Sequence, residues 1–189
     1  KKSLKDIFPQ NEEIVSLDKS LYTYLLEDRQ DHKEVDLIYI GEFFDPGTVS
    51  IQSLSNFIFE GNDAFIIARN ISDTIAREYD IRTTYFSRYD SKIKGSLDTV
   101  THTLIKNNLR AEYPKVDYPA IFTHLDPFNA TILGYLEVEG RLYPNFVKFS
   151  SPVRGGDLYI HLEPDVFSNY YMLNEETFPI AYEALRHLE

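Results

Sequence analysis

The sequence predicts an α/β fold of three layers: a mostly parallel central sheet flanked by helices, with an antiparallel β insertion in the second half. Three observations predict it. The first half of the chain alternates strand-like and helix-like segments, which is typical of parallel strands joined by covering helices. After about residue 95 the pattern changes to β-branched and aromatic residues with turn signals, and the last residues return to helical spacing. The 189 residues suit one domain, 1–189, with the β-rich insertion at about 95–150.

The first half is expected to contain three crossover units. In chain order, the segments are an extended stretch at 13–17, a helix after Asp18, a strand at 35–40, a helix entered at Asp45–Pro46, a strand at 64–68, a helix at 72–79 and a strand at 81–86. The central helix is the most clearly marked, because Ile51, Leu54 and Phe57 keep helical spacing and Gly61 is suited to a left-handed cap.

The second half is expected to be mainly antiparallel. Strands are predicted at 97–104, 131–138, 142–149 and 157–162, and a loop at 113–119. Glu139–Gly140 is a hairpin turn signal, and Pro144 places its strand at a sheet edge or at a bulge because proline lacks an N–H donor. A helix with Ile180, Ala184 and Leu188 on one face, capped by Asn174 or Thr177, closes the chain.

Composition excludes several classes of function. Thirty acidic against 19 basic residues give a net charge of −11, which repels nucleic acid and anionic lipid headgroups. Cysteine is absent, so thiol nucleophiles, cysteine-ligated zinc, iron–sulfur clusters and disulfides are excluded. No apolar run approaches the length of about 18 residues that a membrane span needs.

Two segments carry a family resemblance. They are residues 54–66, LSNFIFEGNDAFI, and residues 155–170, GGDLYIHLEPDVFSNY. Together they resemble an uncharacterised bacterial family, the domain-of-unknown-function family numbered four-three-five-zero, over nearly the whole chain. The resemblance implies a flavodoxin-like or class I glutamine-amidotransferase-like fold. It also implies an extracytoplasmic (periplasmic) position in a membrane-anchored protein, with the anchor outside these residues, and genes beside MoxR-type ATPases. The family supplies no catalytic residues.

The sequence shows no catalytic motif, so no catalytic residue, metal ligand or cofactor is predicted. A serine nucleophile would need a Gly-x-Ser-x-Gly elbow, and Gly95–Ser96 is better explained as a turn. Among the histidines, only His124 has a partner at ligand-like spacing, Asp126, and no third metal ligand is specified. Glycine-rich phosphate loops are missing.

A ligand, if one binds, is expected beyond the carboxyl ends of the parallel strands, where open α/β sheets form their crevice. The polar residues that follow the strands at these ends are Glu42, Arg69, Asn70, Glu163 and Asp165. The alternative for Asp165, and for Ser168 nearby, is a helix cap.

These observations favour a non-catalytic extracytoplasmic binding or assembly domain whose partners are envelope or membrane-associated proteins. The first alternative is a divergent hydrolase that uses Ser, His or Asp in the strand-end crevice. The second is a small-ligand or glycan sensor, which the 14 tyrosines favour because tyrosine offers an apolar ring and a polar hydroxyl.

Overall fold

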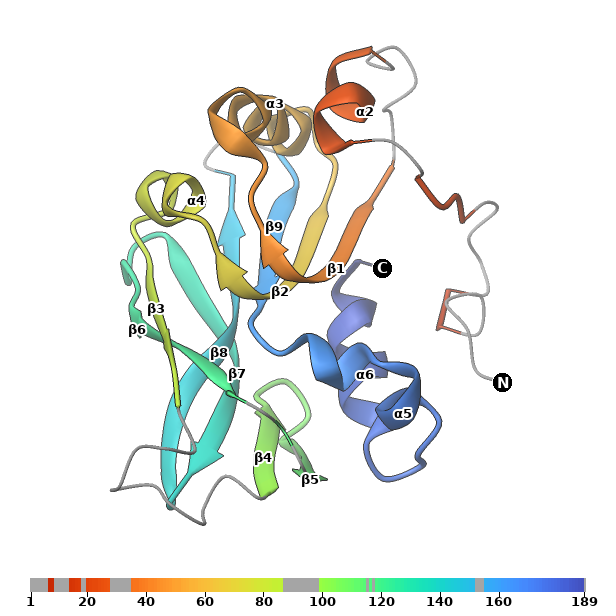
Figure 1. Cartoon of the computed structure of the whole chain (residues 1–189), viewed down its shortest axis with the longest axis vertical. Helices are drawn as coiled ribbons and strands as arrows, with labels where there is room; N and C mark the ends of the chain where they lie inside the picture. Colours follow the sequence, from red (N-terminus) through yellow and green to blue (C-terminus); the bar gives the residue numbers. More distant parts are fainter. Residues whose placement is uncertain are drawn as a thin grey trace.

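The computed structural model describes residues 7–8, 14–17, 20–27, 35–86, 99–114, 116, 118–151 and 155–188, and its main element is a seven-stranded mixed sheet (Figure 1). In spatial order the strands are β1 (Leu37–Phe44), β2 (Ala64–Ile71), β9 (Asp157–His161), β8 (Arg141–Ser150), β7 (Ala130–Val138), β4 (Thr99–Leu104) and β5 (Leu109–Pro114). A separate two-stranded sheet contains β3 (Arg82–Tyr85) and β6 (Ala120–His124).

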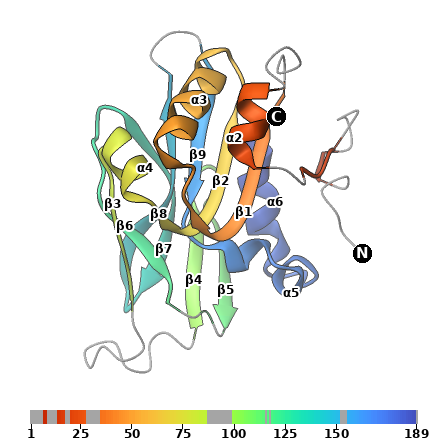
Figure 2. The same cartoon turned by 45° about the horizontal axis from the view of Figure 1, so that its top comes forward.

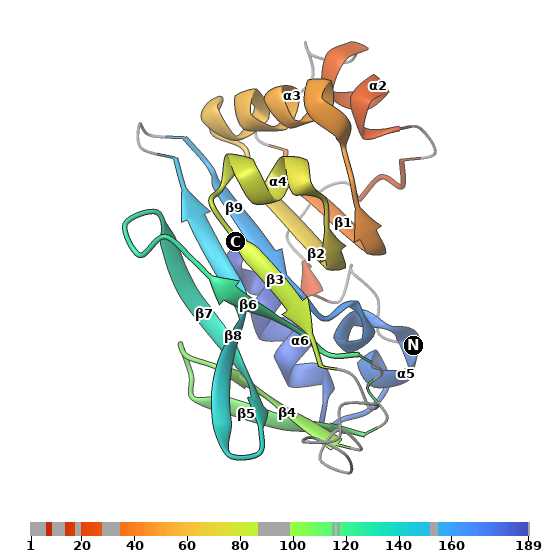
Figure 3. The same cartoon turned by 60° about the vertical axis from the view of Figure 1, so that its left-hand side comes forward.

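The predicted three-layer fold with a mostly parallel sheet is wrong. Among the described strands, only β1 with β2 and β2 with β9 pair in parallel, whereas the other four pairings of the large sheet are antiparallel. The β1–α3–β2 crossover is present, but β3 leaves the large sheet to pair with β6. The neighbour of β2 is instead β9, far along the chain. In the region where an insertion is predicted, β4, β5, β7 and β8 continue the same curled sheet (Figure 3).

Short helices connect and cover the strands. They are α2 (Leu21–Glu27), α3 (Gly47–Phe59), α4 (Asp73–Glu78), α5 (Asn169–Met172) and α6 (Phe178–Leu185), with 3₁₀ turns η1 (Pro164–Phe167) and η2 (Arg186–Leu188). The helical spacing in α3 is confirmed, since Ile51, Leu54 and Phe57 are buried and Gly61 follows with φ of 102°. Within the described residues, none of these helices is long and apolar enough to span a bilayer.

The β7–β8 hairpin follows its turn signal. Glu139 and Gly140 have φ of 51° and 73°, the left-handed pair that a two-residue hairpin turn requires. Pro144 is tolerated in β8 although β8 lies inside the sheet. Its strand pairs with β9 only from Phe146 onward, so proline meets β7 on one side and lies beyond the end of β9 on the other. The register with β7 also shifts near this point.

Apolar side chains form one cluster on each face of the sheet. One cluster joins β1, β2 and β9 to α3, with Leu54, Phe57 and Ile66 buried. The other joins the opposite face to α6, with Phe65, Phe146 and others buried. Figures 1 and 2 show α2 and α3 on one face of these strands and α5 and α6 on the other, with the β3–β6 sheet beside β8. The carboxyl ends of β1, β2 and β9 therefore meet beside η1, between the two clusters.

Candidate functional site

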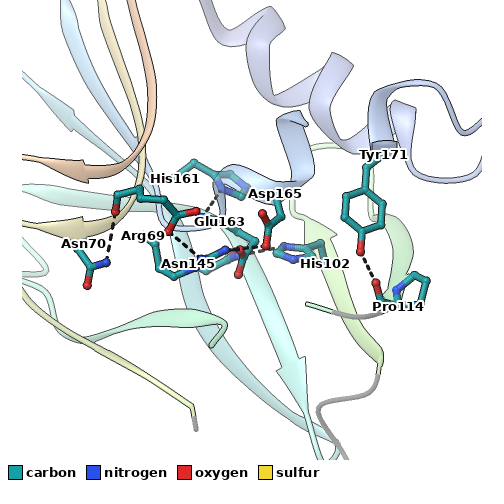
Figure 4. A network of polar contacts seen from close by, with 10 residues as sticks. Arg69, Asn70, His102, Pro114, Asn145, His161, Glu163, Asp165 and Tyr171 are labelled. Atoms are coloured by element: carbon teal, nitrogen blue, oxygen red, sulfur yellow. Dashed lines mark hydrogen bonds and ion pairs between the residues drawn. The ribbon is translucent and has the colours of Figure 1, made fainter. Parts of the chain in front are cut away.

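The structure brings together all five residues that the sequence places at the strand ends. Arg69 is the centre of the group (Figure 4). Its Nη1 donates to Glu42 Oε2 at 2.8 Å, and its Nη2 donates to Glu163 Oε1 at 2.9 Å and to Asp165 Oδ2 at 2.6 Å. Asn70 Nδ2 donates to the main-chain oxygen of Glu42 at 3.3 Å. We call Glu42, Arg69, Asn70, Glu163 and Asp165 the strand-end cluster.

The parallel register of the three strands positions these side chains. Gly41 is opposite Ala68 and Phe43 is opposite Asn70, so Glu42 and Arg69 are lateral neighbours on one face. Ile67 is opposite His161, and the chain leaves β9 directly afterwards. The 3₁₀ turn η1 starts with a proline and carries Asp165 in its first turn back toward Arg69.

The two residues of the capping alternative differ, because Ser168 lies at a helix N-cap and Asp165 does not. Neither η1 nor α5 has a side-chain hydrogen bond at its N-cap, and Ser168 is the N-cap of α5. Asp165 lies two positions after the N-cap of η1, which is Glu163, and its carboxylate bonds to Arg69 instead. A 3₁₀ turn of four residues offers few free N–H groups, whereas the guanidinium offers a full positive charge.

Burial differs sharply within the strand-end cluster. The Glu163 side chain is completely buried and the Arg69 side chain is 11% exposed, whereas Glu42 is 63% exposed. One guanidinium faces three carboxyl groups, so full ionisation would leave an excess of negative charge in a buried place. Burial raises the pKa of Glu163 from 4.5 to about 8, with Arg69 acting in the opposite direction and Asp165 and Glu42 adding to the rise. The same carboxylates raise the pKa of the Arg69 guanidinium against the effect of burial.

Glu163 is therefore a neutral carboxylic acid over much of the neutral range. Its Oε1 accepts from Arg69, and Oε2 has no hydrogen-bond partner among the described residues, which makes Oε2 the natural position of the proton. Glu42 and Asp165 then provide the ionised partners of Arg69. The cluster as a whole carries one net negative charge in this state.

A row of buried polar side chains continues inward from Glu163. The Glu163 main-chain N–H donates to His161 Nδ1 at 3.1 Å, and the His161 and His102 rings stack with centroids 5.9 Å apart. Asn145 Nδ2 donates to His102 Nδ1 at 3.0 Å, and the Asn145 main-chain oxygen accepts from Leu162 N at 2.9 Å. Figure 4 shows these side chains close to Arg69 and Glu163; His161 comes from β9, His102 from β4 and Asn145 from β8.

Both buried histidines are neutral. Burial lowers the pKa of His102 to about 3, and burial together with the nearby His102 lowers the pKa of His161 well below its ordinary value. Each Nδ1 accepts a hydrogen bond, so the ring protons are on Nε2. Each histidine is 1% exposed, which keeps them out of contact with solvent.

A second polar group closes the far end of this face. Tyr113 Oη donates to the Thr177 main-chain oxygen at 2.7 Å, and Thr177 Oγ1 donates to the Tyr171 main-chain oxygen at 2.7 Å. Tyr171 Oη donates to the main-chain oxygen of Pro114. These bonds connect β5 to the segment between α5 and α6, and they place Thr177 at the start of α6, where the sequence predicts a cap.

Other residues that the sequence analysis considered, or missed, lie as follows in the structure. The structure places His124 Nε2 3.4 Å from Asp80 Oδ2, while Asp126 accepts from Phe128 N in a turn. Gly95–Ser96 lies outside the described residues. Asn145 is a member of the polar row that the sequence analysis missed, and the only signal was an asparagine next to Pro144 in a strand of apolar residues.

In the strand-end cluster, the charged side chains bond to one another. Within the described ranges, no set of three or more His, Asp or Glu side chains is arranged to hold a metal ion. The three carboxyl groups that converge at the strand ends converge on Arg69.

Comparison with known proteins identifies similar folds and no family. No protein-family model matches the chain, and no curated protein matches it. Among solved structures, the mmIFT52 N-terminal domain superposes with a TM-score of 0.69 at 15% identity, over 98% of this chain and 88% of that one. The exo-β-1,4-mannosidase Op5Man5 from Opitutaceae bacterium strain TAV5 gives 0.51 at 15% identity, over 89% of this chain but only 30% of the mannosidase. At this identity the likeness shows the fold alone.

Proposed function

We propose that this chain is a non-catalytic domain that binds or assembles with a partner protein. The observation that carries the proposal is the position of Arg69, whose guanidinium lies between three carboxyl groups at the strand ends. Open α/β sheets bind their ligands in this crevice. Here the charged groups at that place bond to one another, and the Arg69 side chain is mostly buried. The cluster therefore connects β1, β2 and η1 by ion pairs within the protein.

The hydrolase alternative has weaker support. A general base must come within hydrogen-bonding reach of the proton that it removes. His102, His161 and Glu163 are all buried, and both histidines use Nδ1 to accept a bond from the protein. The raised pKa of Glu163 is the one property that it shares with a general acid, so Glu163 is the residue on which the two proposals differ most clearly.

The glycan-sensing alternative depends on exposed aromatic side chains. Tyr85 and Tyr118 are the exposed tyrosines in mutual contact, with ring centroids 6.0 Å apart at 90°. Two perpendicular rings present an edge and a face rather than one flat stacking platform. This geometry gives less support to a sugar site than the strand-end cluster gives to a binding domain.

The cellular location and the class of partner that we propose come from the resemblance in residues 54–66 and 155–170. It supports an envelope or membrane-associated protein partner and a periplasmic position, and both stay predictions. The net charge of −11 supports a protein partner over nucleic acid, because a polyanion would be repelled.

The test compares activity and binding in the same preparations. Wild type and Glu163→Gln are assayed against nitrophenyl esters, phosphates and glycosides, and a partner captured by cross-linking is purified and titrated by calorimetry. We expect no turnover above buffer and equal partner affinity for the two proteins. Turnover that Glu163→Gln abolishes while the protein stays folded would contradict the proposal and favour the hydrolase.

A further inference from the structure

The outer edge of β1 is an unpaired edge of the large sheet within the described residues. β1 is the terminal strand of the large sheet, and no described strand pairs with its outer side. It is eight residues long and contains no lysine or proline, the residues with which proteins commonly block an edge. Its two exposed apolar side chains are Ile40, 46% exposed, and Phe43, 54% exposed.

The backbone of β1 leaves hydrogen-bonding groups on that side. Leu37 N donates to Asp63 O, on the side of β2, so the alternation of a strand directs the N–H and C=O of Ile38 and Ile40 away from β2. A long, apolar edge with free backbone groups is a template for an added strand. The strand that is added obtains main-chain bonds from these groups and side-chain contacts from Ile40 and Phe43.

The charge at the end of β1 indicates the chemistry of that strand. Glu42 lies on the same face as Ile40 and is 63% exposed, and Asp165 beside it is 35% exposed. Even with Glu163 neutral, Glu42 and Asp165 outnumber Arg69 by one charge. A cationic side chain next to Glu42 would compensate that charge, and the net charge of −11 would attract it.

We propose that the free edge of β1 accepts an extended segment of a partner protein in which apolar residues contact Ile40 and Phe43 and a lysine or arginine pairs with Glu42. This inference rests on the proposed binding function and names its surface. Strand addition makes the backbone of β1 the main source of affinity, and Glu42 the source of selectivity for a basic segment.

The test uses a capped peptide of about eight residues, mostly valine, with one lysine placed to lie beside Glu42, and a matched peptide with glutamate in place of that lysine. Both are titrated into the ¹⁵N-labelled protein at low salt, with fluorescence anisotropy for affinity and NMR for the location. We expect the lysine peptide to bind at least about tenfold more tightly than the glutamate peptide. We also expect its addition to slow hydrogen exchange at the Ile38 and Ile40 amides.

Three variants locate the site. Ile40→Pro removes the outward N–H, and Ile40→Lys keeps the backbone but places a cation on the edge; each should weaken binding about tenfold or more. Phe59→Ser is the control, because Phe59 is an exposed apolar side chain (59%, against 46% for Ile40) that lies on α3. It should change the affinity less than about twofold.

Several results would overturn the inference. They are equal affinity for the two peptides, an unchanged affinity of Ile40→Lys, protection at β5 instead of β1, or self-association through Ile40 in place of peptide binding. A purified natural partner that binds Ile40→Lys as well as wild type would reject this surface and leave the binding function intact. Substrate turnover lost in Glu163→Gln would instead reject the binding function.

Discussion

Glu163→Gln is the substitution with the most distinctive consequence, because it fixes a buried carboxyl in its neutral form. The folded protein raises the pKa of Glu163 from 4.5 to about 8. Between these values the folded state holds a proton that the unfolded chain releases, so the free energy of unfolding falls as the pH rises. Glutamine cannot lose that proton, so the variant should not show this fall.

The size of the effect follows from the change in pKa. A rise from 4.5 to about 8 corresponds to about 5 kcal/mol of stability that wild type loses between those pH values. Below pH 4.5 the acid and the amide are both neutral, and the two proteins should differ little. The stability of Glu163→Gln relative to wild type should therefore grow steadily with pH up to about 8 and then level off.

Urea unfolding of both proteins at each pH from about 4 to 9 measures this difference. Glu176→Gln is the matched control, since Glu176 is an exposed carboxylate away from the strand-end cluster, and the difference between Glu163→Gln and wild type should change more with pH than the difference for this control. If Glu163→Gln instead lost the same stability at every pH, Glu163 would be ionised in the native protein and the role assigned to burial would be refuted.

Three further predictions concern other parts of the structure. Arg69→Met removes the cation from the cluster and should cost about 3 to 5 kcal/mol in urea unfolding near neutral pH; a loss below about 1 kcal/mol would mean that the carboxyl groups do not depend on Arg69. Burial lowers the pKa of His102 from 6.5 to about 3, so only the unfolded chain takes up a proton at this ring between those pH values, and the free energy of unfolding should fall as the pH drops from 6.5 toward 3. A titration of the His102 ring by NMR with a midpoint near 6.5 would contradict this. Gly156→Ala would place Cβ against the main-chain oxygen of Asn62 and should cost more than about 3 kcal/mol, whereas Gly140→Ala, with φ of 73° and open space around it, should cost about 1 kcal/mol. Equal losses of stability for the two variants in thermal unfolding would refute this distinction.

Local elements of this fold could be predicted because their signals are local. Ile51, Leu54 and Phe57 recur at the spacing of a helix face, and Glu139–Gly140 suits the positive φ angles of a two-residue turn. The order of strands in the sheet could not be predicted this way. The segment of β3 has the same β-branched character whether it joins the large sheet or pairs with β6, and pairing is decided by residues far apart in sequence.

The convergence of the strand-end residues could be predicted although the fold class was wrong. It requires only that β1, β2 and β9 be parallel neighbours, and those pairings exist. The antiparallel strands beyond β9 do not move the carboxyl ends at which Arg69 and Glu163 lie. The polar row next to them could not be predicted, because His102, Asn145 and His161 come from β4, β8 and β9. The order of these strands, with β7 between β4 and β8, is a property of the whole sheet.

The most direct test of the account is the titration of the Glu163 side-chain carboxyl by ¹³C NMR in the wild-type protein, assigned by comparison with Glu163→Gln. If the strand ends are closed by the buried acid and its bond to Arg69, the carboxyl should titrate with a midpoint near 8. A midpoint at or below the ordinary value of 4.5 would show an ionised, solvated carboxylate and would contradict the closed cluster on which the proposed function depends.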